Sequence, residues 1–224
     1  MEDGERNFFT DVANNYDKLS KSLTAGLDNI WRRQAVELAN GMERAKVLDV
    51  ATGTGNIAVM MAKRNRNYSV VGIDTNDDML TIARAKSRGL KNVKYLHGDV
   101  ESLKLKANSF DVVVSAFSLG VFEDLPRAIG EMHRVLKPGG KLILLDINKG
   151  RNKLFMSLLG AYQMFSLTPT FTGDIRREVE AYIHNKRIKI DERMLKEVLE
   201  ERGFREVSSK ELSFKAVFIV TCVK

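Results

Sequence analysis

The sequence predicts a doubly wound α/β fold with a mostly parallel sheet; one pattern predicts this fold, and the length and the cysteine content agree with a core that has no internal staple. Apolar runs alternate with amphipathic helical patterns from about residue 46 to residue 147, as in a parallel sheet covered on both faces. The chain has 224 residues, of which 44% are hydrophobic, and a domain of that size needs no internal staple. Its single cysteine, Cys222, cannot form an internal disulfide.

The elements of the core alternate between strand and helix. We expect strands at residues 46–50, 69–73, 93–97, 110–116 and 141–147, and helices at residues 56–63, 77–88 and 124–136. Gly89 follows the second helix where a C-terminal stop is expected. Pro138-Gly139-Gly140 is expected to end the third helix and turn the chain into the next strand.

Further elements flank the core on both sides. Helical patterns precede it at residues 8–19 and 27–40, and a charged helix at 191–202 and strands at 206–212 and 215–222 end the chain. Residues 153–167 are apolar on nearly every face and indicate a buried helix or a lid over an apolar pocket. We therefore expect one domain over residues 1–224. Its parts are a helical cap (1–44), a core (45–150), a lid or substrate segment (151–190), and a C-terminal helix with a strand pair (191–224).

Composition limits the partners and the compartment. The net charge is +7, but the basic residues are scattered, which is typical of solvated faces and does not favour a nucleic-acid partner. The acidic, polar start lacks the pattern of a signal peptide. The longest nearly uniform apolar stretch, residues 112–122, is far below the ~20 residues that span a bilayer. A lone cysteine fits a reducing compartment, so we expect a cytoplasmic protein.

A glycine loop follows the first strand of the core. Asp49-Val50 ends that strand, and the chain passes through Gly53 and Gly55 into a helix, which places backbone N–H groups over a ligand. Residues 53–58 also fit the dinucleotide fingerprint G-x-G-x-x-G/A, and Asp74 lies 19 residues past Gly55 as a ribose-binding acid would. The loop predicts a cofactor site within residues 45–150. By itself it also allows a nicotinamide dinucleotide as the cofactor.

Three other features favour a different cofactor. Asp49 is a poor neighbour for a pyrophosphate but a favourable one for the ammonium of a methionine moiety. Gly98-Asp99-Val100 follows the third strand, where a carboxylate accepts from an adenine amine while Val100 packs on the ring. Lys137-Pro138-Gly139-Gly140, before the fifth strand, is the third feature.

In this order, the motifs resemble those of class I S-adenosylmethionine-dependent methyltransferases. The resemblance implies S-adenosyl-L-methionine as cofactor and a seven-stranded Rossmann-like sheet with its last strand antiparallel. It also implies that Asp74 holds both ribose hydroxyls and that Asp99 holds the adenine amine. The residues alone also allow Asp74 and Asp99 to cap helices or turns, and Asp49 to brace the loop. The candidate cofactor-binding residues are Tyr16, Asp49, Ala51, Thr52, Gly53, Gly55, Asp74, Thr75, Met79, Gly98, Asp99, Val100 and Ser115.

The N-terminal part narrows the resemblance to one family. Residues 8–17, Gly26-Leu27 and Trp31-Arg32 are similar to the opening of the ubiquinone/menaquinone biosynthesis C-methyltransferase family, and the similarity continues to residue 140. It implies methylation of a ring carbon on a polyprenylated quinol or naphthol, an apolar small molecule, and keeps peripheral membrane contact in view. The family's Gly-Leu-Arg-Asn type segment is replaced here by Ser118-Leu119-Gly120-Val121, so a role there in orienting water or a phenolate does not carry over.

The residues assign no catalytic group and require no metal. Acid or base candidates are His97, His133 and His184, although a lone histidine is more often structural. Tyr16 and Asp17 are better placed if the first helix closes over the cofactor, as the resemblance implies. Aromatic and methionine side chains would either line a substrate pocket or belong to the core. They are Phe117, Phe155, Met156, Tyr162, Met164 and Phe165.

The leading hypothesis is a C- or O-methyltransferase of an apolar aromatic or prenylated small molecule, with C-methylation in quinone biosynthesis as its most specific form. Ser115-Ala116-Phe117-Ser118 lacks the Asn/Asp-Pro-Pro-aromatic element common in base methylation, and one cysteine excludes arsenite methylation. A methyltransferase of RNA or of another small molecule, an NAD-dependent oxidoreductase and a binding protein without chemistry stay as alternatives. The sequence does not indicate an oligomeric state.

Overall fold

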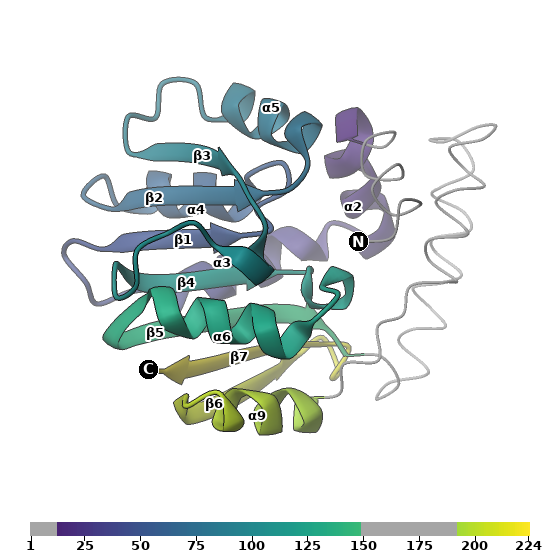
Figure 1. Cartoon of the computed structure of the whole chain (residues 1–224). Helices are drawn as coiled ribbons and strands as arrows, with labels where there is room; N and C mark the ends of the chain where they lie inside the picture. Colours follow the sequence, from purple (N-terminus) through teal and green to yellow (C-terminus); the bar gives the residue numbers. More distant parts are fainter. Residues whose placement is uncertain (1–12, 149–191) are drawn as a thin grey trace.

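A computed structural model describes residues 13–148 and 192–224 of the chain, and these residues form one seven-stranded sheet (Figure 1). The strand order is β3-β2-β1-β4-β5-β7-β6. Only β7 runs against its neighbours, β5 and β6. The sheet therefore confirms the predicted doubly wound, mostly parallel architecture with its last strand antiparallel. The strands are β1 (Lys46–Val50), β2 (Ser69–Asp74), β3 (Val93–His97), β4 (Phe110–Ala116), β5 (Leu136–Ile147), β6 (Arg205–Leu212) and β7 (Val217–Val223).

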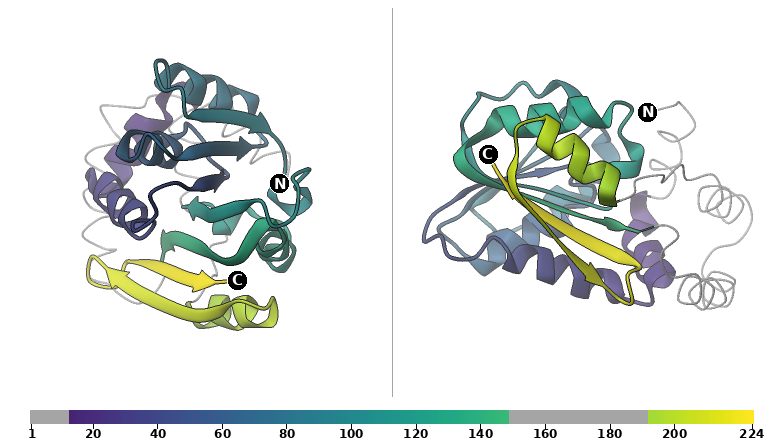
Figure 2. Two further views of the ribbon diagram at one scale, coloured as in Figure 1. Left: turned by 90° about the vertical axis from the view of Figure 1, so that its left-hand side faces the viewer. Right: turned by 90° about the horizontal axis from the view of Figure 1, so that it is seen from below.

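Helices cover both faces of the sheet (Figure 2). On one face lie α6 (Leu125–Val135) and α9 (Glu192–Glu201), and on the other α3 (Leu27–Glu37), α4 (Asn56–Arg64) and α5 (Asp77–Lys86). Alternate residues of a strand point to opposite faces. Leu48 and Val50 of β1 therefore join the core under α6, and Val47 joins the core under α4. Because both faces are buried, the central strands carry consecutive apolar residues, such as Val112, Val113 and Val114 of β4.

The N-terminal part of the described chain lies over the carboxyl ends of the strands. A 3-10 turn (Ala13–Asn15) leads into α2 (Tyr16–Thr24). The predicted C-terminal end of the first helix, residue 19, is wrong, because the helix continues for five more residues. It ends at Ala25 and Gly26, which have left-handed φ angles of 52° and 78°. Residues 8–12 of that prediction and the predicted helix at 153–167 lie outside the described residues. Among the described residues, no helix is long and apolar enough to cross a membrane.

The fifth strand begins earlier than predicted. β5 starts at Leu136 directly after α6, so Pro138-Gly139-Gly140 is part of the strand and does not form a separate turn. Leu136 pairs with Phe110, but Lys141 pairs with Val112, so the segment holds extra residues relative to β4. Such a bulge interrupts the hydrogen-bond ladder between β4 and β5. The backbone of the bulge is hydrogen-bonded instead to the C-terminal residue: Gly139 N donates to Lys224 O, and Lys224 N donates to Gly140 O, both at 3.0 Å.

Candidate active site

A cavity lies at the carboxyl ends of the parallel strands, where β1 separates β2 from β4. Doubly wound sheets bind their ligands at this point, because the chain leaves the two central strands toward opposite faces. The walls come from the segments that follow β1, β2, β3 and β4, together with α2. The lining residues are Tyr16, Ala51, Gly53, Asp74, Thr75, Asn76, Met79, Gly98, Asp99, Val100, Glu101, Ala116, Phe117, Ser118, Val121, Phe122 and Glu123.

The two glycines of the loop have different reasons to be glycine. Gly53 has a φ of 53°, and a Cβ there would meet nothing within 4 Å, so its small size leaves room for a ligand against the backbone. Gly55 has a φ of 78°, and a Cβ there would lie 2.6 Å from Tyr95 Oη and 2.9 Å from Ala83 Cβ. Gly55 is required by packing and does not line the cavity, whereas Gly53 does.

Asp74 ties the end of β2 to the glycine loop. Its Oδ2 accepts from Gly53 N at 2.7 Å and its Oδ1 from Asn76 N at 3.0 Å. Burial raises the pKa of Asp74, although these backbone N–H groups lower it in part. A carboxylate has about four lone-pair positions, so each oxygen keeps capacity for a ligand hydroxyl. Asp74 lines the cavity, as a ribose-binding acid requires.

Asp99 both caps a turn and faces the cavity. Its Oδ1 accepts from Glu101 N at 2.8 Å at the start of the 3-10 helix η2 (Val100–Ser102). Val100, next in the chain, also lines the cavity. Asp99 therefore caps the turn and also lines the cavity, and its contact with an adenine remains a prediction.

Asp49 is buried beneath the loop and does not line the cavity. Its Oδ2 accepts from Thr52 Oγ1 at 2.5 Å and from Ala58 N at 3.0 Å. Burial raises the pKa of Asp49 to about 7, against the lowering effect of those hydrogen bonds. These contacts are those of a brace for the loop, and contact with a cofactor remains a prediction.

The predicted residues Thr52 and Ser115 also lie behind the cavity wall and do not line it. Thr52 N donates to Ile73 O at 3.0 Å, which fixes the loop to β2. Ser115 is fully buried and is hydrogen-bonded to Val50 O and to the Ser118 hydroxyl. The Ser115 side chain thereby supports Ser118, which does line the cavity.

The first turn of α2 is joined to the glycine loop. Tyr16 lines the cavity, and Asp17 accepts hydrogen bonds from Thr54 Oγ1 and Lys86 Nζ, both at 2.7 Å, and from Asn56 Nδ2 at 3.0 Å. Burial alone would raise the pKa of Asp17, but these hydrogen bonds and the Lys86 charge lower it. Asp17 is therefore ionised at neutral pH.

The remaining wall is more apolar. Phe117 lines it with an unusual φ of 62°, and its ring lies 6.1 Å from the Trp31 ring and 4.8 Å from the Arg32 guanidinium carbon. Next comes the 3-10 helix η3 (Leu119–Val121), which Asp146 holds by accepting from Leu119 N at 2.9 Å. Val121 of this helix and its C-cap residue Phe122 face the cavity.

Sequence reasoning found the side of this cavity that carries Asp74 and Asp99 better than the side that carries Val121 and Phe122. Nine of the thirteen predicted cofactor residues line the cavity, and so does Phe117, the one predicted pocket residue that lies in the described part of the chain. The prediction missed seven lining residues, Asn76, Glu101, Ala116, Ser118, Val121, Phe122 and Glu123. Most of them directly follow β2 or β4, so the strand-end rule contained a signal for them.

The histidine candidates do not meet in the cavity. His97 is exposed, with Nε2 3.0 Å from Thr75 O, and it does not line the wall. His133 packs edge-on against Phe204 at 4.9 Å between centroids, and burial lowers its pKa. His184 and the pocket candidates Phe155, Met156, Tyr162, Met164 and Phe165 lie outside the described residues.

The fold and the carboxylates at the ends of β2 and β3 define the class of protein, and solved structures agree on the fold. An S-adenosylmethionine-dependent methyltransferase from Thermotoga maritima matches with a TM-score of 0.72 and 19% identity, covering 97% of this chain and 99% of that one. A putative one from Methanococcus maripaludis matches with a TM-score of 0.70 and 23% identity, covering 97% and 94%. The chain has the fold of an S-adenosylmethionine-dependent methyltransferase.

Sequence comparison then gives the family. The model of the ubiE/COQ5 methyltransferase family matches residues 2–224, so the chain belongs to that family. The demethylmenaquinone methyltransferase of Thermus thermophilus is 43% identical over 140 residues, which are 62% of this chain and 63% of that protein. The ubiquinone/menaquinone biosynthesis C-methyltransferase of Shewanella sp. strain ANA-3 is 32% identical over 206 residues, covering 89% and 82%. The chain is thus an S-adenosylmethionine-dependent methyltransferase, and the dinucleotide alternative is not favoured.

Proposed function

We propose that this methyltransferase transfers a methyl group to a ring carbon of a prenylated quinol or naphthol. Its relatives support this, since one is named a demethylmenaquinone methyltransferase and another a ubiquinone/menaquinone biosynthesis C-methyltransferase. The observation that carries the proposal is the two-sided cavity. One side presents Asp74 and Asp99, and the other presents Phe117, Val121 and Phe122. A polar nucleoside and an apolar aromatic acceptor fit these two sides.

The residues present fit S-adenosyl-L-methionine. Asp74 would hold the ribose hydroxyls with its unused lone pairs, Asp99 would accept from the adenine amine, and Val100 would pack on the ring. Gly53 leaves space for close approach of the ligand to the loop. When bound, the cofactor supplies an activated methyl group on a sulfonium. Thr75, Met79 and Gly98 complete the proposed cofactor side.

The apolar wall would contribute to the reaction in two ways. Phe117, Val121 and Phe122 exclude water from the acceptor side, and loss of the sulfonium charge during transfer is favoured where water is absent. The same side chains would hold the acceptor carbon in line with the methyl group, which supplies rate by orientation. Asp146 supports this wall through η3.

A prenylated acceptor resides in a bilayer, so we also propose that the protein works from the cytoplasm and meets the membrane surface. The contact would be peripheral. Methylation of RNA or of a soluble small molecule is the competing function.

The test is transfer of labelled methyl groups from S-adenosyl-L-methionine into a lipid extract, compared with transfer into RNA. We expect label in a lipid-soluble quinone fraction and none in RNA. Asp74→Ala is the inactive control, and Asp78→Ala, at an exposed position on α5, is the matched active one. Label in RNA alone would refute the proposal.

A further inference from the structure

The exposed apolar side chains gather at the edge of the sheet that carries the cavity. Among the described residues, the large apolar side chains with high exposure are Ile30 at 50%, Met194 at 40% and Phe214 at 77%. Phe214 lies in the turn that follows β6. Because β6 runs parallel to β5, this turn lies at the edge of the sheet where the parallel strands have their carboxyl ends. Ile30 and Met194 lie in the first turns of α3 and α9, and both helices lead back to the amino end of the next strand.

The turn that carries Phe214 has a conformation that its residues do not favour. Ser213, Phe214 and Lys215 have left-handed φ angles of 47°, 55° and 73°, and Ala216 N donates to Ser213 O at 3.2 Å. Two-residue hairpin turns with positive φ at both central positions prefer Asn and Gly. The backbone conformation of this turn would therefore favour other residues where this chain has Phe and Lys, and it leaves the Phe214 side chain 77% exposed.

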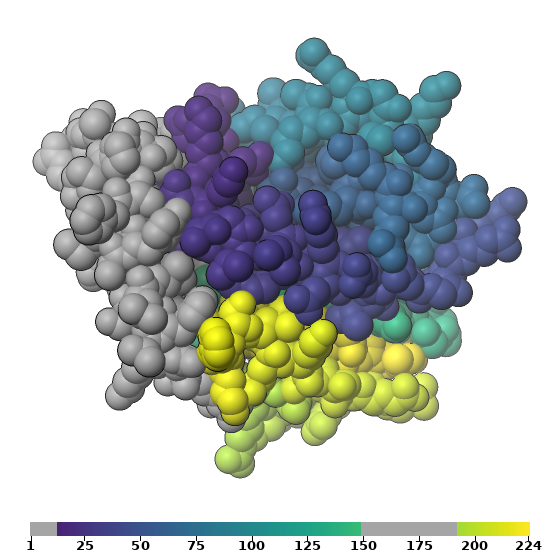
Figure 3. All heavy atoms as spheres, turned by 180° about the vertical axis from the view of Figure 1, so that it is seen from behind, coloured from purple at the N-terminus to yellow at the C-terminus, as the bar shows by residue number. Residues whose placement is uncertain are grey.

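This turn is connected to the wall of the cavity. Ser213 Oγ accepts a hydrogen bond from Trp31 Nε1 at 2.8 Å, and the Trp31 ring lies 6.1 Å from the Phe117 ring in the wall. The yellow hairpin and the purple α3 lie side by side in the view of Figure 3. The position of the hairpin is thus coupled, through the buried Trp31, to that of Phe117 in the cavity wall.

The surroundings of the hairpin carry positive charge. Lys215 follows Phe214, Lys210 is near the end of β6, and Arg33 lies one helical turn from Ile30, and all three are exposed. Glu211 pairs with Lys215 at 3.3 Å, while Lys210 Nζ donates to the neutral Gln34 at 3.1 Å. Exposed apolar side chains with basic neighbours match the surface of an anionic bilayer, which takes up an aromatic ring and attracts lysines.

We propose that residues 213–215, together with Ile30, form a docking surface for an anionic phospholipid bilayer and bring the cavity to the lipid that holds the acceptor. The proposal rests on the proposed function, since it names the surface through which the membrane contact is made. Phe214 inserts at the lipid boundary, and Lys210 and Lys215 contact the headgroups.

Sedimentation of the full chain with vesicles tests this surface without any substrate. The vesicles are phosphatidylcholine alone or phosphatidylcholine with phosphatidylglycerol. We expect the unaltered chain to bind the anionic vesicles. The affinity of Phe214→Asn should be lower by about tenfold or more, because this variant has no aromatic side chain to transfer from water into the lipid. Since Asn tolerates the left-handed conformation, this variant should unfold at the same or a higher temperature, which excludes misfolding as the cause.

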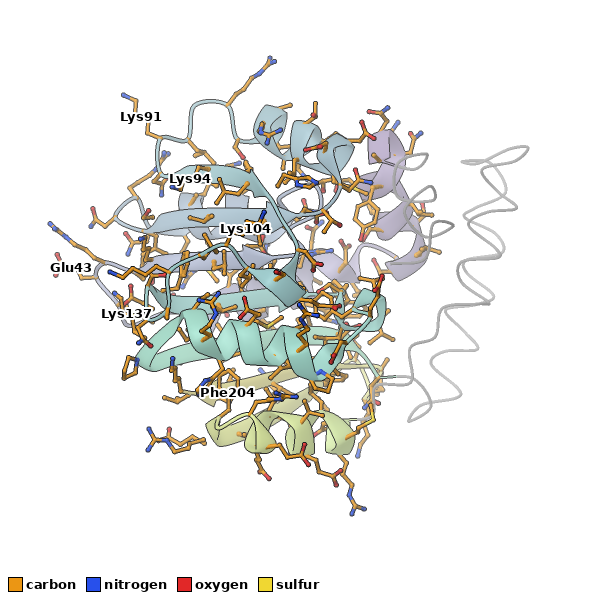
Figure 4. The ribbon with its side chains drawn as sticks, viewed as in Figure 1. Glu43, Lys91, Lys94, Lys104, Lys137 and Phe204 are labelled. Atoms are coloured by element: carbon orange, nitrogen blue, oxygen red, sulfur yellow. The ribbon has the colours of Figure 1, made fainter. Side chains whose placement is uncertain are left out.

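Charge is tested with two matched pairs of substitutions. The double variant Lys210→Gln/Lys215→Gln should bind anionic vesicles at least about threefold more weakly than the unaltered chain. The control Lys91→Gln/Lys94→Gln removes the same charge near the opposite edge of the sheet (Figure 4) and should bind the vesicles as the unaltered chain does. Three results would each contradict the proposed docking surface. They are equal binding by both double variants, full binding by Phe214→Asn, and no binding by the unaltered chain.

Methyl transfer to a short-chain, water-soluble quinol without vesicles separates the two proposals. Phe214→Asn should keep full activity in that assay, because Phe214 does not line the cavity. Failure of the unaltered chain on this acceptor would count against the proposed function, while the vesicle result would stand by itself.

Discussion

The Asp17 carboxylate accepts a 2.7 Å hydrogen bond from the Lys86 ammonium, which joins the first turn of α2 to the last turn of α5 across the glycine loop. Thr54 and Asn56 of the loop belong to the same network. Tyr16, next to Asp17, forms part of the cavity wall. The contact thus fixes α2 in the position that closes the proposed cofactor site.

Lys86→Met should therefore weaken the binding of S-adenosylhomocysteine by about threefold to tenfold, the range of a partly exposed charged hydrogen bond. Isothermal titration calorimetry measures it. Arg193→Met removes an exposed charge that pairs with Glu197 on α9 and should leave the affinity unchanged. Equal affinities in both variants would show that the contact does not hold the site closed.

Asp74→Ala should lower the affinity for S-adenosylhomocysteine by about a hundredfold. The loss combines two hydrogen bonds from a charged acceptor to ribose hydroxyls, each about 1.5–3 kcal/mol, partly offset by solvation of the vacated site. Asp78→Ala, in the exposed first turn of α5, should bind normally. If Asp74→Ala also binds normally, the ribose assignment is wrong.

The buried Asp49 predicts a pH dependence of stability. Its pKa is about 7 in the folded chain, against an ordinary value of 3.8, so between these values the unfolded chain releases the proton more readily. Unfolding therefore becomes more favourable as the pH rises from about 4 to about 7, by up to about 4 kcal/mol, and levels off above that.

Asp49→Asn removes this titration, so its stability relative to the unaltered chain should rise over the same pH interval. Urea unfolding at pH 5 and pH 8 measures the difference. Parallel pH curves for the two proteins would mean that Asp49 is not held in its protonated form by burial.

The two loop glycines should respond differently to alanine. Gly55→Ala brings a Cβ to 2.6 Å from Tyr95 Oη and should lower the free energy of unfolding by about 2–4 kcal/mol. Gly53→Ala meets nothing within 4 Å and should lower it by only about 1–2 kcal/mol, while it weakens cofactor binding. Tyr95→Phe should restore part of the stability of Gly55→Ala. A loss of equal size at both glycines would contradict the packing argument.

The sequence predicted the sheet well because burial on both faces gives the central strands consecutive apolar residues, as at Val112, Val113 and Val114 of β4. It placed the start of β5 five residues late, because the pairing of Gly139 and Gly140 with Lys224 depends on the chain end. The sequence did not decide whether Asp49 lies beneath the loop. That position depends on the hydrogen bonds that Asp49 accepts from Thr52 Oγ1 and Ala58 N.

The acceptor side was harder to predict for a similar reason. Val121 and Phe122 end the apolar stretch of residues 112–122, and only their position after β4 and the contact of Asp146 with η3 bring them to the cavity. The direction of Phe214 depends on three left-handed residues that no local signal predicts.

The most direct test of the proposed reaction is the position of the transferred methyl group. The full chain is incubated with S-adenosyl-L-methionine labelled with ¹³C in the methyl group and with a demethylated prenyl naphthoquinol in mixed micelles, and the product is examined by NMR. We predict that the label appears as a methyl group on a ring carbon and that Asp74→Ala gives none. Label in a methoxy group, or an acceptor that stays unlabelled while the chain methylates RNA, would contradict the proposed reaction.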